Sequence, residues 1–225
     1  MSLSLKLREG TSQNHSQAES ARFIRCFMKG VLERESYSKL LEAFYFIYSA
    51  LENELEKHKS DSILSNIYFP ALYRKESIEK DLSFFKGKSW KDKLSESRAT
   101  QNYVNRIKEV SQDKSYLLVA HSYVRYLGDL SGGQILKKIA AKAMDIGEKG
   151  GLDFYEFPEL KSPNEFKKSY REALDKLPIS SIQEEEILEE AKSVFNMNQS
   201  IFLELEEVLI QNIGREKFES TLQIT

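Results

Sequence analysis

The sequence predicts an all-α fold built as a single domain. Three observations support this prediction: the 225 residues include only four prolines, apolar residues recur at three- and four-residue spacing rather than in alternation, and no repeat or linker rich in Gly, Ser or Pro divides the chain. We expect one domain over residues 1–225, with about seven to nine helices at the usual helix length. Its last residues, about 12 of them, are expected to form a flexible tail.

The composition is that of a soluble globular protein and excludes several functions. Apolar residues make up 40% of the chain and charged residues 30%, with 33 basic and 35 acidic side chains, so no nucleic-acid-binding surface is indicated. No apolar stretch has the length of a signal peptide or a membrane span, which predicts a cytosol-like compartment and no membrane contact. Cys26 is the single cysteine, which excludes an internal disulfide, a cysteine-ligated iron–sulfur cluster and a four-thiolate zinc site.

Two helices are expected in the first quarter of the chain. Apolar residues from Phe23 to Met28 recur at helical spacing and predict a helix over residues 15–29, with Gly30 as its C-terminal cap. A broad apolar stripe predicts a second helix over residues 38–57.

The later helices are separated by clear interruptions. Pro70 and Gly87 break the periodic pattern, and the segment GEKGGLDFYEFPEL is loop-like. The serines and early carboxylates of SSIQEEE suit the start of the last long helix. The expected helices after Pro70 span residues 77–85, the region around 103–110, 116–144, 162–177 and 180–213.

The sequence GDLSGGQ, from Gly128 to Gln134, places three glycines inside the longest predicted helix. A glycine in a helix interior costs about 0.5–1 kcal/mol relative to alanine, so the run needs a compensating role. Glycine lets a helix bend and lets its backbone approach a partner closely. Two interpretations stay open: a flat cofactor lies against Gly128, Gly132 and Gly133, or another helix packs there. The run lacks the spacing and the lysine of a phosphate-binding loop.

The three histidines differ in what surrounds them. His58 lies at a charged helix end, where a histidine needs no special role. His121, inside LLVAHSYVRY, is interpreted as a hydrogen-bonded core residue. His15 has Glu19 four positions further on, and a carboxylate there can hold one ring nitrogen and leave the other for a metal. Because ordinary surface pairs share this spacing, both interpretations of His15 stay open.

The patterns of common helical metal enzymes do not occur. The chain has neither the Glu-x-x-His repeats of di-iron bundles nor a His-Glu-x-x-His zinc motif. A single neutral histidine among apolar aromatic residues is the usual proximal arrangement for haem. The glycine run could then form the opposite face of such a cofactor.

Several motifs together resemble the haem (heme) oxygenase family. HSYVRYLGDLSGGQILKKIA is similar to the family signature over the distal helix, and HSQAES is similar to its proximal-histidine segment. FYFIYSALE, IYFPALYRK, FKKSYR and EEAKSVFNMNQSIF match in the same order, from about Leu5 to Ile210. The residues around IYFP and the compact length resemble cyanobacterial and algal members. The resemblance implies a multi-helix fold with haem between a proximal helix and a glycine-kinked distal helix.

The resemblance also implies a reaction. Haem, as both substrate and cofactor, would be opened with O2 at the alpha-meso carbon to biliverdin IX-alpha, carbon monoxide and ferrous iron. His15 would ligate the iron, oriented by Glu19, and Asp129 matches the distal aspartate whose ordered water supplies a proton during oxygen activation. The other residues that match the distal hydrogen-bonded network or touch the distal ligand are Tyr48, Arg125, Asn198, Gly128 and Gly132.

Further residues would contact the edge of the haem. Its anionic propionates favour basic partners at the pocket mouth, and those contacts set which ring-edge carbon is attacked. Ser12 is a departure from the pattern, because animal members carry a further lysine at that position. The expected propionate partners are Arg8, Tyr123, Lys167 and Arg171, and the other expected cofactor-binding residues are Gly133, Phe27, Phe195 and Phe202.

No flavin or cluster signature is present, so the resemblance implies an external electron donor. Ferredoxin is the donor in cyanobacterial and plastid relatives, and Lys137, Lys138 and Lys142 are expected to offer it a basic patch. A bilin reductase that uses the product is a further expected partner, and the protein is expected to be a monomer.

Three alternatives compete with the enzyme, and one of them, a purely structural helical bundle, would leave the cost of the glycine run without a purpose. Of the other two, the first is a haem carrier without turnover, which Asp129 disfavours because a carrier has no need to protonate bound oxygen. The second is a helical enzyme that degrades thiamine-like compounds, which is disfavoured by His15, Glu19 and the glycine run occurring together.

Overall fold

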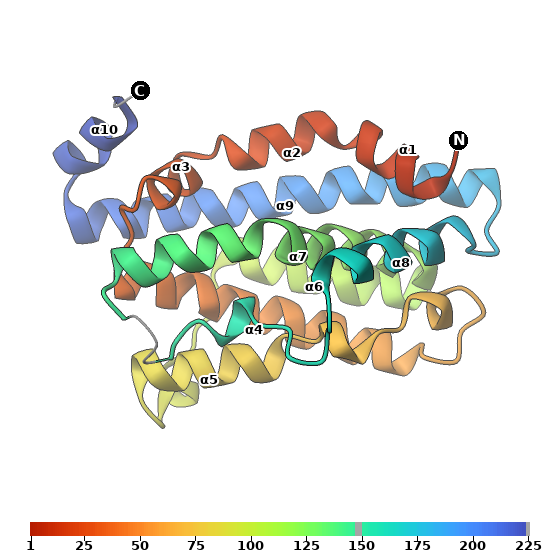
Figure 1. Cartoon of the computed structure of the whole chain (residues 1–225), viewed down its shortest axis with the longest axis horizontal. Coiled ribbons are helices and arrows are strands. Elements are labelled where there is room, and N and C mark those ends of the chain that lie inside the picture. Colours follow the sequence, from red (N-terminus) through yellow and green to blue (C-terminus); the bar gives the residue numbers. More distant parts are fainter. Residues whose placement is uncertain (147–149, 224–225) are drawn as a thin grey trace.

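The structure is a computed structural model that describes residues 1–146 and 150–223 and contains helices but no strands in these ranges. The prediction of an all-α fold is confirmed, and Figure 1 shows the long helices lying roughly side by side. None of the described helices combines the length and the apolar character that crossing a bilayer requires. The α-helices are α1 Leu3–Gly10, α2 Ser12–Glu19, α3 Arg22–Met28, α4 Arg34–Lys57, α5 Lys75–Lys86, α6 Arg98–Asp113, α7 Leu118–Ala143, α8 Pro163–Asp175, α9 Ser181–Ile213 and α10 Arg215–Gln223, and the 3-10 helices are η1 Leu64–Ile67, η2 Pro70–Leu72, η3 Trp90–Lys93, η4 Ser115–Leu117 and η5 Asp153–Tyr155.

Helix α9 holds the bundle together. It begins at the serines that predict a helix start, with a capping box whose second member is Gln183 rather than a carboxylate. The Ser180 side chain accepts from the Gln183 N–H at 3.3 Å, and the Gln183 side chain accepts from the Ser180 N–H at 2.9 Å. From there α9 packs against α1, α2, α3, α4, α6, α7 and α10. One helix can therefore carry side chains both to α2 and to α7.

Helix α7 runs unbroken through the glycine run. Its helical assignment extends from Leu118 to Ala143, and Gly128, Gly132 and Gly133 keep ordinary helical backbone without a positive φ. The glycines therefore do not end the helix, and their role must lie in what their missing side chains leave open.

The expected single helix over residues 15–29 is wrong, because the chain leaves the helix at Ala21, whose φ of −53° and ψ of 134° are not helical. The break is hidden in the sequence because α2 has no buried residue and so contributes no apolar pattern of its own. The expected cap at Gly30 is confirmed: its φ is +76°, and its N–H donates to the Phe27 carbonyl at 2.8 Å.

The end of the chain forms helix α10 through residue 223, where a flexible tail was expected. Phe218 of α10 is fully buried, and the Arg22 guanidinium lies 4.8 Å from the centre of its ring. Arg22 also pairs with Glu206 of α9 at 2.7 Å and with Glu219 of α10. The ten α-helices described exceed the expected number because the apolar pattern reveals neither α1, nor the break between α2 and α3, nor α10.

Candidate functional site

Four predicted residues from three helices form one hydrogen-bonded network. Arg125 of α7 donates to the Tyr48 hydroxyl of α4 through Nε at 3.0 Å and Nη2 at 2.8 Å, and through Nη1 to Asn198 Oδ1 of α9 at 3.0 Å. The Tyr48 hydroxyl in turn donates to Oδ2 of Asp129, one turn after Arg125. The structure therefore brings together all four residues expected in the distal network.

Tyr48, Arg125 and Asn198 are buried and the Asp129 side chain is 10% exposed, which sets the electrostatics of the network. Burial raises the pKa of Asp129, while the positive charge of Arg125 and the hydrogen bond from Tyr48 act in the opposite direction. Burial also raises the pKa of Tyr48 well above its usual value, which keeps its hydroxyl protonated as a donor. The Arg125 guanidinium lies 4.3 Å from the centre of the Phe44 ring. The arrangement can hold a carboxylate in one orientation away from bulk water.

The three glycines beside Asp129 differ in whether they leave space for a ligand or permit close packing within the protein. A Cβ added to Gly128 or Gly132 would meet no atom within 4 Å, so α7 has an open flank at both positions. A Cβ on Gly133 would lie 3.2 Å from Cδ1 of Tyr155, so this glycine permits close packing on η5. Gly128 and Gly132 thus leave room for a ligand, whereas Gly133, expected to contact the cofactor, has a packing partner within the protein.

His15 lies on α2 with its side chain 55% exposed. Its Nδ1 is 3.5 Å from Oε2 of Glu19, the predicted partner, whose side chain is 69% exposed. The Phe195 ring of α9 meets the imidazole edge-on with centroids 5.8 Å apart. Since Nδ1 faces Glu19, Nε2 is the nitrogen that can ligate a metal.

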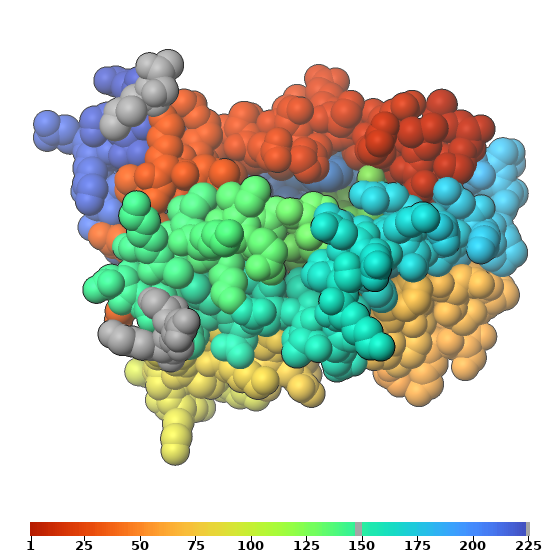
Figure 2. Space-filling view, viewed as in Figure 1, coloured from red at the N-terminus to blue at the C-terminus, as the bar shows by residue number. Residues whose placement is uncertain are grey.

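The two halves of the site face a common furrow. Both α2 and α7 pack on α9, and Figure 2 shows the blue surface of α9 at the bottom of a furrow between the red α2 and the green α7. An exposed imidazole on α2, an open glycine flank on α7 and a carboxylate beside it that is only 10% exposed fit a flat, iron-containing macrocycle such as haem.

The predicted propionate partners gather at the junction of α1, α7 and α8. Arg8 and Arg171 are exposed, and both lower the pKa of Tyr123, against the larger effect of burial, which raises it. Arg8 and Arg171 are thus both near enough to Tyr123 for their charges to act on its hydroxyl. Lys167 is half-buried on α8, one turn before Arg171.

The expected aromatic wall is only partly assembled around His15. Phe195 contacts the imidazole, as described above. Phe202 is half-buried and stacks on Phe23 with centroids 6.3 Å apart, and Phe27 is buried against Tyr37 at 6.4 Å. Phe27 and Phe202 thus contact other core rings, as aromatic residues at helical spacing commonly do.

The other two histidines have structural partners. His121 is fully buried, with Nε2 3.0 Å from Oε1 of Glu190, and burial lowers its pKa, which favours the neutral ring. His58 follows α4, and its Nε2 lies 2.9 Å from the Ser111 hydroxyl. The interpretation of His121 as a hydrogen-bonded core residue is confirmed.

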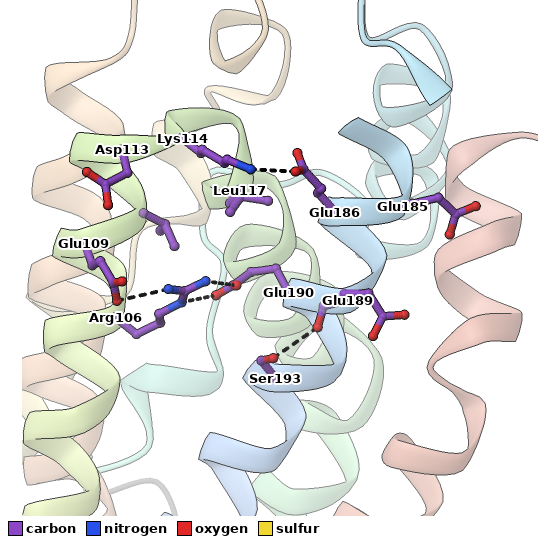
Figure 3. Close-up of a pocket in the computed structure, with 11 residues that line it drawn as sticks. Arg106, Glu109, Asp113, Lys114, Leu117, Glu185, Glu186, Glu189, Glu190 and Ser193 are labelled. Atoms are coloured by element: carbon purple, nitrogen blue, oxygen red, sulfur yellow. Dashed lines mark hydrogen bonds and ion pairs between the residues drawn. The ribbon is translucent and has the colours of Figure 1, made fainter. Parts of the chain in front are cut away.

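A groove of about 490 Å³ lies between α6 and α9 but is not part of this site. Figure 3 shows Arg106 reaching across it to Glu190, with Nε and Nη2 donating at 3.0 and 2.6 Å. Lys114 pairs with Glu186 at 2.5 Å in the same groove. The charged side chains that line this groove are largely paired with one another, and neither His15 nor Asp129 is among its lining residues.

The lysines expected to form a basic patch differ in their surroundings. Lys137 forms an ion pair with Glu156, so part of its charge is neutralised within the protein. Lys138 and Lys142 are exposed on the same helix, and the side chain of Ile135 nearby is 57% exposed.

Sequence reasoning missed residues that support the network from behind. Phe44 lies under Arg125, Glu52 and Arg74 lie buried behind Tyr48, and Phe154 packs on the Tyr48 ring at 5.7 Å. The only signal was that Phe44 and Glu52 fall in FYFIYSALE and Arg74 in IYFPALYRK, segments in which the match gave these three residues no role.

The fold and the site together define a class of protein: an all-helical bundle with an exposed histidine on one wall of a furrow and a glycine-flanked, buried acid network on the other. The family model described as Heme oxygenase matches residues 1–204. The chain belongs to the haem oxygenase family.

Individual relatives agree with this assignment. Heme oxygenase 1 of Synechocystis sp. is 50% identical over 98% of this chain and 91% of its own length, and Heme oxygenase of Guillardia theta is 48% identical over 91% of this chain and 86% of its own. The crystal structure of the Synechocystis protein in complex with heme superposes with a TM-score of 0.93 at 50% identity, covering 98% of this chain and 99% of that one. The crystal structure of Synechocystis heme oxygenase-2 in complex with heme and NO superposes with a TM-score of 0.95 at 39% identity, covering 98% of this chain and 92% of that one.

Proposed function

We propose that this chain catalyses the reaction of its family, the O2- and electron-dependent opening of haem to biliverdin, carbon monoxide and Fe²⁺. The observation that carries the proposal is the buried Tyr48–Arg125–Asp129–Asn198 network beside the open flank of α7. A protein that only stored haem would gain nothing from a carboxylate held in this way, whereas proton delivery depends on one.

When bound, haem supplies both the iron that activates O2 and the ring that is cleaved. His15 Nε2 would ligate the iron, and Glu19 would hold the opposite ring nitrogen. Asp129 would order water on the other face and pass a proton through it, while Tyr48 and Arg125 hold the carboxylate in place. The open flank at Gly128 and Gly132 leaves room for haem and water.

The finer features of the reaction belong to the same proposal. Arg8, Tyr123, Lys167 and Arg171 would hold the propionates and so direct cleavage to the alpha-meso carbon, giving biliverdin IX-alpha. Electrons would come from a ferredoxin docked on α7, and a bilin reductase would use the product. We expect the protein to act as a monomer.

The experiment is a hemin titration followed by turnover. The wild type should give a Soret band that His15→Ala loses or shifts and the control His58→Ala retains. With reduced ferredoxin in air and catalase present, the Soret band should be replaced by biliverdin absorption. Asp129→Asn should bind hemin but form biliverdin about 100-fold more slowly, whereas Asp113→Asn, an exposed acid on α6, should not differ from the wild type.

Two results would contradict the proposal. Haem that binds but stays intact with reductant and air would make the protein a carrier. Absence of hemin binding would contradict the roles of both His15 and the open flank of α7.

A further inference from the structure

Arg74 is a buried arginine outside the network described above. It is 3% exposed and directly precedes α5. Its guanidinium donates to main-chain carbonyls: Nε to Leu72 at 2.9 Å, and Nη1 to Glu156 and, at 3.4 Å, to Phe154. The guanidinium carbon lies 3.8 Å from the centre of the Phe157 ring. In the described ranges the Arg74 guanidinium forms no ion pair with a carboxylate, and the Glu52 carboxyl meets Arg74 through its main-chain N–H instead.

Two of these carbonyls, those of Phe154 and Glu156, belong to a segment that contacts the site from two sides. The Phe154 ring meets the Tyr48 ring at 5.7 Å with an interplanar angle of 68°. The next residue, Tyr155, accepts a hydrogen bond through its carbonyl from Gln134 Nε2 of α7 at 3.0 Å. The side chain of Arg74 thus fixes a segment that packs on both Tyr48 and the helix of Asp129.

The backbone of Arg74 is tied to the same place. Its N–H donates to Oε1 of Glu52, and the N–H of Lys75 donates to the same oxygen at 3.2 Å. Glu52 lies one turn after Tyr48 on α4. Arg74 is therefore anchored through its main chain to the helix that carries Tyr48 and through its side chain to the segment that covers the Tyr48 ring.

Arg74 also acts on Asp129 through its charge. Its positive charge, with that of Arg125 and the hydrogen bond from Tyr48, opposes the rise that burial causes in the pKa of Asp129. Asp129 is, after burial, the largest influence on the pKa of Arg74, so the interaction is mutual. In a low-dielectric interior, such a charge acts beyond contact distance. The titratable or charged groups that interact with Asp129 are Tyr48 from α4, Arg74 before α5, Tyr103 from α6, Arg125 from α7 and Tyr155 from η5.

We propose that Arg74 is a positioning residue for the reaction: it holds the Phe154–Glu156 segment, and with it the Phe154 ring, against Tyr48, and its positive charge adds to that of Arg125 in favouring the carboxylate form of Asp129. The inference rests on the proposed function, in which Asp129 orders the water that delivers the proton. An ionised Asp129 accepts hydrogen bonds from both Tyr48 and water, whereas a protonated one would donate and reorganise the network.

The test separates the charge of Arg74 from its hydrogen bonds. Arg74→Gln keeps donors for the carbonyls but removes the charge, and Arg74→Lys keeps the charge but loses the planar fork. The Asp129 carboxyl is titrated by carbon-13 NMR in the haem-free protein, its signal being assigned by its absence in Asp129→Asn. Arg74→Gln should raise the pKa of Asp129 by about one unit, and Arg74→Lys should restore the wild-type value.

Arg106→Gln is the matched control, because Arg106 is also an arginine bound to the interior but pairs with Glu190. It should leave the titration of Asp129 unchanged. An unchanged pKa in a folded Arg74→Gln would overturn the proposal. If Arg74→Gln does not fold, Arg74→Lys decides: an unchanged pKa supports the role of the charge, and a rise as large as about one unit overturns it.

The measurement uses no haem, so the two proposals can fail separately. A wild type that does not cleave haem would overturn the proposed function and leave the Asp129 titration intact. Normal turnover with no dependence of the Asp129 pKa on Arg74 would overturn only the inference about Arg74.

Discussion

The hydroxyl of Tyr48 on α4 donates a hydrogen bond to Oδ2 of Asp129 on α7, across 81 positions of the chain. The oxygen of that hydroxyl is also the acceptor for two nitrogens of Arg125. The Tyr48 hydroxyl therefore accepts hydrogen bonds from Arg125 and donates one to Asp129. A residue of α4 thus connects two oppositely charged residues of α7.

We predict that Tyr48→Phe destabilises the protein by about 1–3 kcal/mol, because the buried Arg125 and Asp129 each lose a partner while the ring volume is kept. Urea unfolding of the haem-free protein measures this change. Tyr126→Phe is the control: Tyr126 is equally buried, but its hydroxyl has no hydrogen-bond partner in the described structure, so its loss should be nearly neutral. Equal effects of the two substitutions would contradict the role given to the Tyr48 hydroxyl.

We predict opposite effects on stability and on haem binding when the glycines on the open flank are replaced. Gly128→Ala and Gly132→Ala should stabilise the haem-free protein by up to about 1 kcal/mol, because alanine favours a helix and the added Cβ meets nothing. Both should weaken hemin binding, because the Cβ occupies space that the ligand needs. Thermal unfolding and hemin titration measure the two effects.

Gly133→Ala is the internal comparison for that prediction. Its Cβ would lie 3.2 Å from Tyr155, so the substitution should forgo the gain in stability unless the ring moves. A similar gain at all three positions, with unchanged hemin affinity, would show that the open flank of α7 does not hold the ligand.

We predict that Glu52 makes the protein less stable as pH rises towards neutrality. Burial raises the pKa of Glu52 from 4.5 to about 7, although the N–H groups of Arg74 and Lys75 oppose the rise. Because the folded chain binds this proton more tightly than the unfolded chain, the stabilisation is complete below about pH 4.5 and is lost as pH rises through about 7. Across this pH range the free energy of unfolding should fall by an amount on the order of 3 kcal/mol.

Glu52→Gln cannot ionise and should remove this dependence. Urea unfolding at intervals from about pH 5 to about pH 8 compares the variant with the wild type. Asp81, whose pKa burial also raises to about 7, is present in both proteins, so the difference between the two curves isolates Glu52. Parallel curves would contradict the raised pKa of Glu52.

We predict that charge reversal on α7 slows ferredoxin-driven turnover but not turnover driven by a chemical reductant. Lys138→Glu with Lys142→Glu should have the larger effect, and Lys137→Glu a smaller one, because Lys137 already pairs with Glu156. The effect should shrink as salt concentration rises. The control is Lys176→Glu after α8, at the end of the molecule opposite to the C-terminal end of α7 in Figure 1. If the variants lose no more of the wild-type rate with ferredoxin than with the chemical reductant, α7 is not the docking surface.

The long helices could be predicted from the sequence because each has its own periodic pattern or cap. Ser180 caps the start of α9, as the serines of SSIQEEE indicate, and Gly30 takes the positive φ of a C-terminal cap. The break at Ala21 could not be predicted, since α2 is exposed and carries no apolar stripe. Helix α10 was missed because its only apolar residues are Phe218 and Leu222, too few to show a periodic pattern, and the partner of Phe218, Arg22, lies far away in the chain.

The members of the site were predictable, but only in part from physical reasoning. The resemblance to a family gave the set Tyr48, Arg125, Asp129 and Asn198. The structure links Asp129 to Tyr48, and Tyr48 and Asn198 to Arg125, by hydrogen bonds. Spacing alone could pair only His15 with Glu19. Arg74 could not be found in either way, because its interactions are with main-chain carbonyls, which any sequence provides.

The central position of α9 has a consequence for how the protein is made. Residues 181–213 are synthesised last among the long helices, yet α1, α2, α3, α4, α6 and α7 all pack on them. A nascent chain that ends before Ser181 must leave the apolar faces of those helices uncovered, and it lacks both Phe195 and Asn198. Most of the chain therefore emerges from the ribosome before the helices on either side of the furrow have their support, and assembly of the haem-binding face must wait for α9.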